Sequence, residues 1–222
     1  MKSELTLIIP TKNEKESLPV FLKELKKYRY KILIVVDPKD QHKYKIKKNR
    51  LISIKKQKKP GYGNALIEGI NSTKTKYFSI INADGSMNPK DLDKMLKLCK
   101  KNNDFIFASR YSKNGGSDDD TTLTFIGNKI FSLIGKVLFD LKISDILFTY
   151  ILGKTSKAKK LKLKSPDFKL CVEIPIKQKR MGYNYNSIPS FERKRIGGEK
   201  KVNEFIDGLL ILFAMFYFFF NK

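Results

Sequence analysis

The sequence predicts an α/β fold: a mostly parallel sheet with helices on both of its sides. Its first half contains five short apolar runs, rich in β-branched and aromatic residues, which are typical of strands buried on both faces. Segments with helical apolar spacing separate these runs, and such alternation indicates a parallel sheet. The predicted strands cover residues 5–10, 32–36, 51–54, 77–81 and 105–108.

Two of the predicted helices carry a clear apolar face. In each, four apolar side chains recur at intervals of three and four residues, or next to one another, which places them on one side of a helix. These sets are Leu18, Phe21, Leu22 and Leu25, and Leu92, Met95, Leu96 and Cys99. In sheets of this kind, ligands bind beyond the carboxyl ends of the strands. Polar motifs at those ends are therefore the first candidates for a functional site.

The second half contains two further apolar segments. Between residues 121 and 141, apolar side chains repeat at helical spacing, and a helix facing the core is at least as well supported as one at a membrane surface. Residues 208–220 carry no charge and would form a helix of roughly 20 Å, short of the ~30 Å hydrocarbon core of a bilayer. We expect this segment to dip into a membrane without crossing it, as a tail (202–222) that follows one domain (1–201).

The formal net charge of +24 comes mainly from lysine. It predicts attraction to nucleic acid, an anionic membrane or phosphorylated substrates, although most lysines are expected to form a solvated surface without a specific nucleic-acid site. Cys99 and Cys171 lack metal-site spacing and are expected to be buried and reduced, as in the cytosol. The single histidine, His42, excludes a histidine-based zinc site and a Ser-His-Asp triad.

Polar residues follow the first two predicted strands. A polar turn with Thr11, Asn13 and Glu14 is expected after the first strand. Its backbone N–H groups and side chains could contact a ligand, or the side chains could cap the next helix. Asp37 ends the second strand, a position from which a carboxylate commonly accepts hydrogen bonds from a base or a ribose hydroxyl. A turn stabilised before Pro38 explains Asp37 equally well.

A Gly-x-Gly pair and an Asn-x-Asp pair follow later strands. Gly61 and Gly63 permit a tight turn and close approach of the backbone to a phosphate or nucleoside, but the segment lacks the other residues of a dinucleotide-binding fingerprint or a P-loop. Asn82 and Asp84 offer oxygen ligands to Mg²⁺ or Mn²⁺, with substrate phosphates completing the shell. An Asx turn is the alternative for this second pair.

Arginine is rare in this lysine-rich chain, so its positions are informative. Arg110 lies at the end of the fifth predicted strand. Arg195 begins a segment with two glycines and Lys201, which is suited to closing on phosphate oxygens. An exposed basic loop is the simpler explanation of that segment.

The order of these motifs resembles family 2 glycosyltransferases with the GT-A fold, especially dolichol-phosphate mannose synthase and bacterial polyprenyl-phosphate sugar transferases. The resemblance spans essentially the whole chain. It implies that Asn82 and Asp84 correspond to a metal-binding Asp-x-Asp, and that Asp145 lies near an acidic acceptor-side position. The residues it places at the nucleotide, the diphosphate or an anionic acceptor are Pro10, Thr11, Glu14, Asp37, Gly61, Gly63, Arg110, Arg195 and Lys201.

Three departures from that family pattern stand out. Asn82 replaces the first acid of Asp-x-Asp, so metal affinity is expected to be weaker. Pro38 follows Asp37 where a second acid is usual. In the basic segment, residues 198–201 replace a closing Gly-x-Ser-Lys and lose a hydroxyl.

The resemblance implies transfer of a sugar, with inversion, from a UDP- or GDP-sugar with Mg²⁺ or Mn²⁺. The acceptor would be a polyprenyl phosphate or a surface glycan at the cytoplasmic face of the membrane, with the protein attached peripherally or shallowly. A hydroxyl acceptor would need a base, for which Asp145 is the candidate. Two alternatives remain open from sequence: a non-catalytic basic protein that binds nucleic acid or anionic lipid, and a nucleotidyltransferase, although residues 6–14 lack the glycine-rich signature of the latter.

Overall fold

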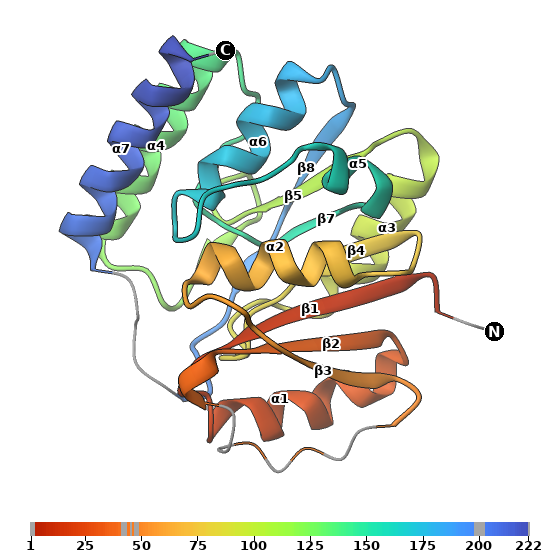
Figure 1. Ribbon diagram of the computed structural model, residues 1–222. Coiled ribbons are helices and arrows are strands. Elements are labelled where there is room, and N and C mark those ends of the chain that lie inside the picture. The colour runs from red at the N-terminus through yellow and green to blue at the C-terminus, as the bar shows by residue number, and fades with distance from the viewer. Residues whose placement is uncertain (1–2, 41–43, 45, 47–48, 198–202, 222) are drawn as a thin grey trace.

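The computed structural model describes residues 3–40, 44, 46, 49–197 and 203–221. Within them, seven strands form a sheet in the order β3-β2-β1-β4-β7-β5-β8 (Figure 1). Its neighbours are parallel except at β7, which runs antiparallel between β4 and β5. The strands are β1 (Leu5–Thr11), β2 (Lys31–Val36), β3 (Ile52–Lys56), β4 (Tyr77–Ile80), β5 (Phe105–Ser109), β7 (Ile151–Lys154) and β8 (Tyr185–Pro189). The predicted α/β class and mostly parallel sheet are confirmed.

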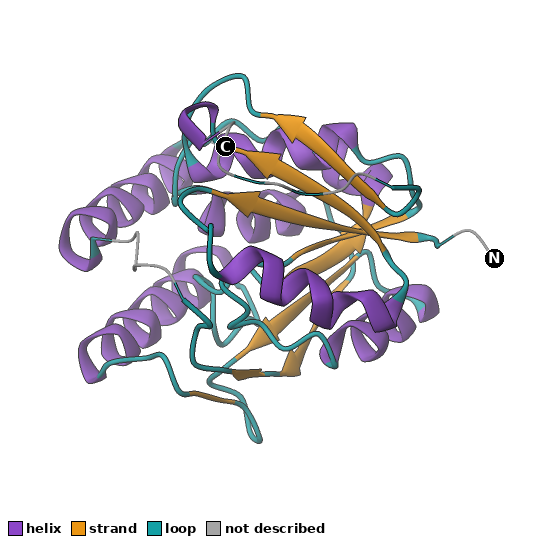
Figure 2. Ribbon diagram, turned by 90° about the horizontal axis from the view of Figure 1, so that it is seen from below, coloured by secondary structure: helices purple, strands orange, loops and turns teal. Residues whose placement is uncertain are grey.

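Helices cover both faces of this sheet (Figure 2). α1 (Ser17–Leu25) and α3 (Asp91–Lys101) each bury three of their four predicted apolar residues on one face, and the fourth, Leu22 or Leu96, packs there at partial burial. α2 (Tyr62–Ser72), α5 (Thr155–Lys160) and α6 (Leu170–Arg180) cover the other. Successive residues of β1 divide between the two cores, as the two-residue period of a strand requires: Ile8 packs on the side of α2, and Leu7 and Ile9 pack on the side of α1.

A second, two-stranded sheet joins β6 (Gly116–Ser117) to β9 (Phe191–Glu192). Two short 3₁₀ helices also occur, Lys26–Tyr28 after α1 and Pro38–Asp40 after β2. The small sheet brings the segment after β5 next to the segment after β8, although they are far apart in sequence. Both segments contribute to the site described below.

α4 (Thr122–Phe139) turns most of its large apolar residues outward, which contradicts the core-facing helix, one of the two alternatives that the sequence left open. The side that meets the protein carries Asn128, Ser132 and Gly135. The Oγ of Ser132 accepts a hydrogen bond from the backbone N–H of Ile146 at 3.1 Å. Small and polar residues therefore make the fully buried contacts, while Phe131, Ile134 and Phe139 pack on the core at partial burial. Among the described residues, α4 alone is long and apolar enough to cross a membrane, judged by length and composition only.

α7 (Glu204–Phe220) lies beside α4 and contacts α6 (Figure 1), so the predicted tail packs on the domain by one of its sides. Ile211, Ala214 and Met215 are buried there. The helix has 17 residues, about 25 Å at 1.5 Å per residue, and is longer than the uncharged run but still shorter than a bilayer core.

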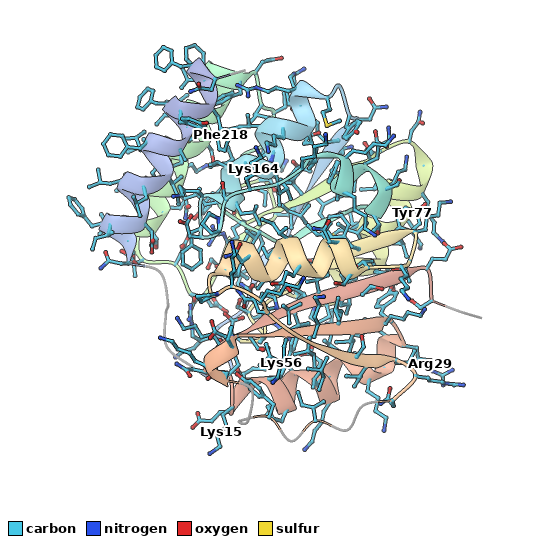
Figure 3. All side chains as sticks on the ribbon, in the orientation of Figure 1. Lys15, Arg29, Lys56, Tyr77, Lys164 and Phe218 are labelled. Atoms are coloured by element: carbon cyan, nitrogen blue, oxygen red, sulfur yellow. The ribbon has the colours of Figure 1, made fainter. Side chains whose placement is uncertain are left out.

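The outer sides of α4 and α7 expose a set of large apolar side chains, here named the apolar face. Aromatic rings of α7 project away from the sheet (Figure 3). Members of the apolar face are Leu123, Phe125, Ile126, Ile130, Leu133, Val137, Phe205, Ile206, Leu209, Leu210, Phe213, Phe216, Tyr217, Phe219 and Phe220.

Candidate active site

A cavity of about 960 Å³ lies beyond the carboxyl ends of β1 to β5. It reaches from the ends of β2 and β3 to the amino-terminal turns of α4 and α7. Most of the residues singled out from sequence therefore meet at this edge of the sheet, as expected for residues at the carboxyl ends of parallel strands. Those that line the cavity are Pro10, Thr11, Glu14, Asp37, Gly61, Asn82, Asp84, Arg110 and Arg195. Gly63 and Asp145 are not part of the lining, and Lys201 lies outside the described residues.

Packing explains the two glycines at the start of α2, Gly61 at its N-cap and Gly63 in its first turn. Gly61 has φ +119°, and a Cβ there would lie 2.3 Å from the carbonyl oxygen of Pro166. A Cβ on Gly63 would lie 2.2 Å from the carbonyl oxygen of Ser165. Both positions are needed because the segment before α6 crosses directly over the start of α2. The ligand contact expected from sequence is retained only for Gly61, which lines the cavity.

Asp84 is held in an Asx turn at the end of β4. Its Oδ1 accepts hydrogen bonds from the backbone N–H of Ser86 at 3.0 Å and from its hydroxyl at 2.9 Å. The backbone N–H of Ile196 donates to the Asp84 carbonyl at 2.8 Å, and that of Arg193 donates to the Ser86 carbonyl at 2.8 Å. The turn is thus clamped by the segment that follows β9. The Asx turn and a metal-binding role are compatible, because Oδ2 has no described partner.

Asn82 is engaged on the inner side of the cavity. Tyr62 donates its hydroxyl to Asn82 Oδ1 at 3.1 Å and contacts the Thr149 hydroxyl at 2.6 Å. Tyr62 also stacks on Phe168 with ring centroids 5.0 Å apart. Asp84 therefore supplies the one carboxylate of the Asn-x-Asp pair. Within the described residues, no cluster of three or more acidic, His or Cys side chains is arranged for a metal. One carboxylate completed by substrate phosphates fits Mg²⁺ or Mn²⁺.

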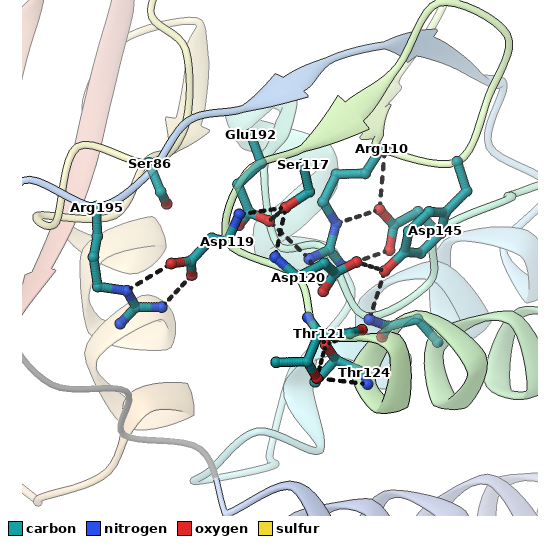
Figure 4. Close-up of polar contacts among 12 residues, drawn as sticks. Ser86, Arg110, Ser117, Asp119, Asp120, Thr121, Thr124, Asp145, Glu192 and Arg195 are labelled. Atoms are coloured by element: carbon teal, nitrogen blue, oxygen red, sulfur yellow. Dashed lines mark hydrogen bonds and ion pairs between the residues drawn. The ribbon is translucent and has the colours of Figure 1, made fainter.

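Arg110 sits in a cage of carboxylates (Figure 4). Its Nε and Nη2 donate to the two oxygens of Asp145 at 2.7 and 2.9 Å, and Nη1 donates to Glu192 at 3.0 Å. A third carboxylate, that of Asp120, lies 3.5 Å away. Burial opposes the charge of Arg110, but Asp145 and Glu192 outweigh burial and raise the pKa of the guanidinium. Arg110 is a fixed cation at the wall of the cavity.

This geometry does not support Asp145 as a catalytic base. Asp145 is 1% exposed, and its Oδ2 also accepts the backbone N–H of Arg110 at 3.0 Å. Both oxygens of this carboxylate are occupied by Arg110, and Asp145 is not part of the cavity lining. The structure gives Asp145 the role of holding Arg110.

Arg195 crosses the cavity to an ion pair with Asp119. The hydrogen bonds that Arg195 donates to Asp119 are the main cause of its raised pKa, and the charge of Asp84 contributes as well. Arg195 therefore lies near both carboxylates. Asp119 and Asp120 were not singled out from sequence, although three consecutive acids at 118–120 in a chain of net charge +24 were an available signal. Tyr62, Gln57 and Glu192 were also missed.

Comparison with known proteins identifies the family. Residues 6–162 match the sequence model described as glycosyl transferase family 2. The chain belongs to glycosyl transferase family 2. It is a glycosyltransferase of that family. This excludes the two alternatives left open from sequence, a non-catalytic basic protein and a nucleotidyltransferase. An uncharacterized protein of Methanocaldococcus jannaschii is 28% identical over 196 residues, covering 85% of this chain and 81% of that protein. An uncharacterized glycosyltransferase of Mycobacterium bovis is 29% identical over 106 residues, covering 48% of each.

Solved glycosyltransferase structures share the GT-A fold seen here. Glucosyl-3-phosphoglycerate synthase from Mycobacterium tuberculosis, in complex with Mn²⁺, UDP and phosphoglyceric acid, has a TM-score of 0.71 at 10% identity. The match covers 98% of this chain and 78% of that one. The same enzyme with Mn²⁺, UDP-glucose and phosphoglyceric acid has a TM-score of 0.72 at 10% identity, over 100% and 81% of the two chains. At this identity the likeness shows the fold alone. The narrower resemblance to dolichol-phosphate mannose synthase stays a prediction.

Proposed function

We propose that this family 2 glycosyltransferase moves a sugar from a nucleoside diphosphate sugar to a lipid-linked acceptor at a membrane surface. One observation carries the proposal. A single cavity runs from the strand ends with Asp37 and Asp84 to the first turns of α4 and α7, where Leu123 and Phe205 belong both to the cavity lining and to the apolar face. A polar donor site that opens onto an apolar surface suits an acceptor with a polar head and an apolar chain.

The donor end is argued from the strand ends. Asp37 and the turn after β1 would take the nucleoside, and the diphosphate would lie toward Asp84 and Arg195. Mg²⁺ or Mn²⁺ held by Asp84 and the phosphates would offset the charge of the leaving diphosphate. Arg195, already beside Asp84, would exchange Asp119 for phosphate oxygens. The related fold bound to Mn²⁺ and UDP supports this placement by analogy.

The acceptor end is lined by apolar and small residues of two helices. They include Phe131 and Gly127 of α4 and Gly208 and Ile211 of α7. A Cβ on Gly208 would lie 4.0 Å from the ring of Phe131, and the two helices meet at this end of the cavity. An apolar chain attached to the acceptor would pass along this lining toward the apolar face.

The apolar face supports peripheral attachment to a membrane. Soluble monomers rarely expose contiguous apolar patches larger than a few hundred Å². Lys129, Lys136 and Lys142 lie on or just after α4 and would meet anionic headgroups. We place the protein at the cytoplasmic face, with α4 and α7 lying in the interface and not across the bilayer.

The transfer is an inverting displacement. The acceptor oxygen bonds to the anomeric carbon while the bond from that carbon to the diphosphate breaks, and the nucleoside diphosphate leaves with the electron pair. A polyprenyl phosphate oxygen is already anionic and needs no base. This acceptor fits a site in which Asp145 is locked by Arg110.

The test is an incorporation assay with radiolabelled UDP- and GDP-sugars and Mn²⁺. Vesicles with polyprenyl phosphate are one acceptor, and phosphoglyceric acid or a soluble glycan is the other. We expect label in the lipid extract, lost on Asp84→Asn. Asp140→Asn is the matched control, because Asp140 is exposed, lies at the far end of α4 and has φ 51°, which asparagine tolerates. Label found only in water-soluble product would refute the lipid acceptor.

A further inference from the structure

Asp37 and Gln57 follow neighbouring parallel strands at the same level. β2 and β3 pair with Val36 opposite Lys56, and the backbone N–H of Gln57 donates to the Val36 carbonyl at 3.0 Å. Because adjacent strands are about 4.8 Å apart, the two side chains lie next to each other. Both are nearly buried, at 4% and 5% exposure, and both line the cavity.

The amide of Gln57 has a fixed orientation. Its Nε2 donates to the Gly61 carbonyl oxygen at 2.6 Å. That carbonyl also accepts the backbone N–H of Ala65 at 3.0 Å, in the first turn of α2, so its direction is set by the helix. Reversing the amide would place oxygen against oxygen. Gln57 therefore keeps its Oε1, which has no described partner in the protein, as an acceptor for a ligand in the cavity.

Asp37 is likewise an acceptor. Its Oδ1 receives the backbone N–H of Lys39 at 3.0 Å, and its backbone N–H donates to the Thr11 carbonyl at 3.0 Å. These bonds hold the carboxylate at the strand end and leave Oδ2 without a described partner. Asp37 Oδ2 and Gln57 Oε1 therefore present two adjacent acceptors to a ligand, while the amide nitrogen of Gln57 is turned toward the Gly61 carbonyl.

The hydrogen-bonding edges of the nucleobases differ in how they match two adjacent acceptors. Guanine has adjacent donors, N1–H and the N2 amino group. Uracil has one N–H flanked by two carbonyl oxygens, and adenine and cytosine place an acceptor nitrogen beside their amino group. When a buried acceptor of the protein faces an acceptor of the base, a hydrogen bond is lost and the two atoms repel each other. Such a site therefore discriminates strongly against bases that do not present two adjacent donors.

We propose that Gln57 and Asp37 together read the base of the donor and select guanine, so that the donor is a guanosine diphosphate sugar. The inference rests on the proposed use of a nucleoside diphosphate sugar and adds which nucleotide it is. The UDP complexes of the structural neighbours share only the fold at 10% identity.

The test is isothermal titration calorimetry of the full chain with GDP, UDP, ADP and inosine diphosphate in the presence of Mn²⁺. Wild type should bind GDP at least tenfold more tightly than UDP or ADP. Inosine diphosphate lacks the N2 amino group and should also bind at least tenfold more weakly than GDP. This comparison uses only the wild-type protein, so it does not depend on a variant folding.

Gln57→Leu removes the acceptor at similar side-chain volume. It should weaken GDP at least tenfold while changing UDP less than threefold. Asp84→Asn, at the diphosphate, should weaken GDP and UDP to the same extent. Equal binding of GDP and UDP by wild type, or an equal loss of both in Gln57→Leu, would overturn the assignment while leaving the proposed function intact. If no nucleoside diphosphate binds, the proposed function fails and this inference fails with it.

Discussion

Replacing Leu133 and Val137 by serine should detach the protein from membranes without unfolding it. Leu133 is 59% exposed and Val137 is 72% exposed in water. Full burial of such a side chain is worth about 1.5–3 kcal/mol, so insertion of the exposed parts of both would contribute about 2–4 kcal/mol. At 1.4 kcal/mol per factor of ten, the double variant should lose roughly 30-fold or more in its vesicle partition coefficient.

The assay is co-sedimentation with vesicles of phosphatidylcholine and phosphatidylglycerol at fixed salt. Val20→Ser on α1 is the control, because Val20 is 50% exposed on a helix that contributes nothing to the apolar face. Thermal melting should change little in either protein, since the replaced side chains are exposed. An unchanged partition of the double variant, or an equal loss in Val20→Ser, would refute the role of the apolar face.

Three further predictions test the site and its packing. Asp145→Asn should lower the free energy of unfolding by about 3–5 kcal/mol, because it leaves the buried Arg110 without its main partner. Urea denaturation measures this, and a loss below about 1 kcal/mol would contradict the structural role of the ion pair between Asp145 and Arg110. Burial raises the pKa of Cys99 and of Cys171 to about 12, so neither should react with a thiol reagent at pH 8 until the chain is unfolded, when two thiols should titrate. Gly63→Ala should lower stability by about 1–3 kcal/mol because its Cβ would meet Ser165, whereas Gly127→Ala, with nothing within 4 Å, should be neutral or stabilising in a melting experiment.

The first half of the fold was predictable because local pattern and burial agree there. β1, β2 and β4 are apolar runs buried on both faces, and α3 buries the positions that its spacing selects. β7 is harder, since its four residues pair antiparallel with two strands that are distant in sequence. β8 has only one fully buried position, Ile188, so it lacks the apolar run that marked the others.

The composition of the site was predictable, but its internal pairing was not. Asp37, Asp84 and Arg110 each follow a parallel strand and therefore lie at the same edge of the sheet. The expectation that ligands bind beyond the carboxyl ends of such strands was enough to group them. Which carboxylate binds which guanidinium depends on the relative placement of segments 35 to 82 residues apart, such as Arg110 with Asp145 and with Glu192. No local pattern carries that information, so the pairing of Asp145 with Arg110 could not be read from the sequence.

The orientation of α4 was also beyond prediction from sequence, and its packing explains why the apolar face exists. Periodicity finds the apolar side of a helix but does not say which side faces inward. In this chain the inner side is already occupied by contacts that larger residues would prevent: a Cβ on Gly135 would lie 2.8 Å from Ile146, and Ser132 bonds the backbone of that same residue. Most of the large apolar residues of α4 are left outside, where their exposure to water is costly. Because the cavity opens between the same two helices, a bilayer that covers the apolar face would also bring a lipid-linked acceptor to the mouth of the site.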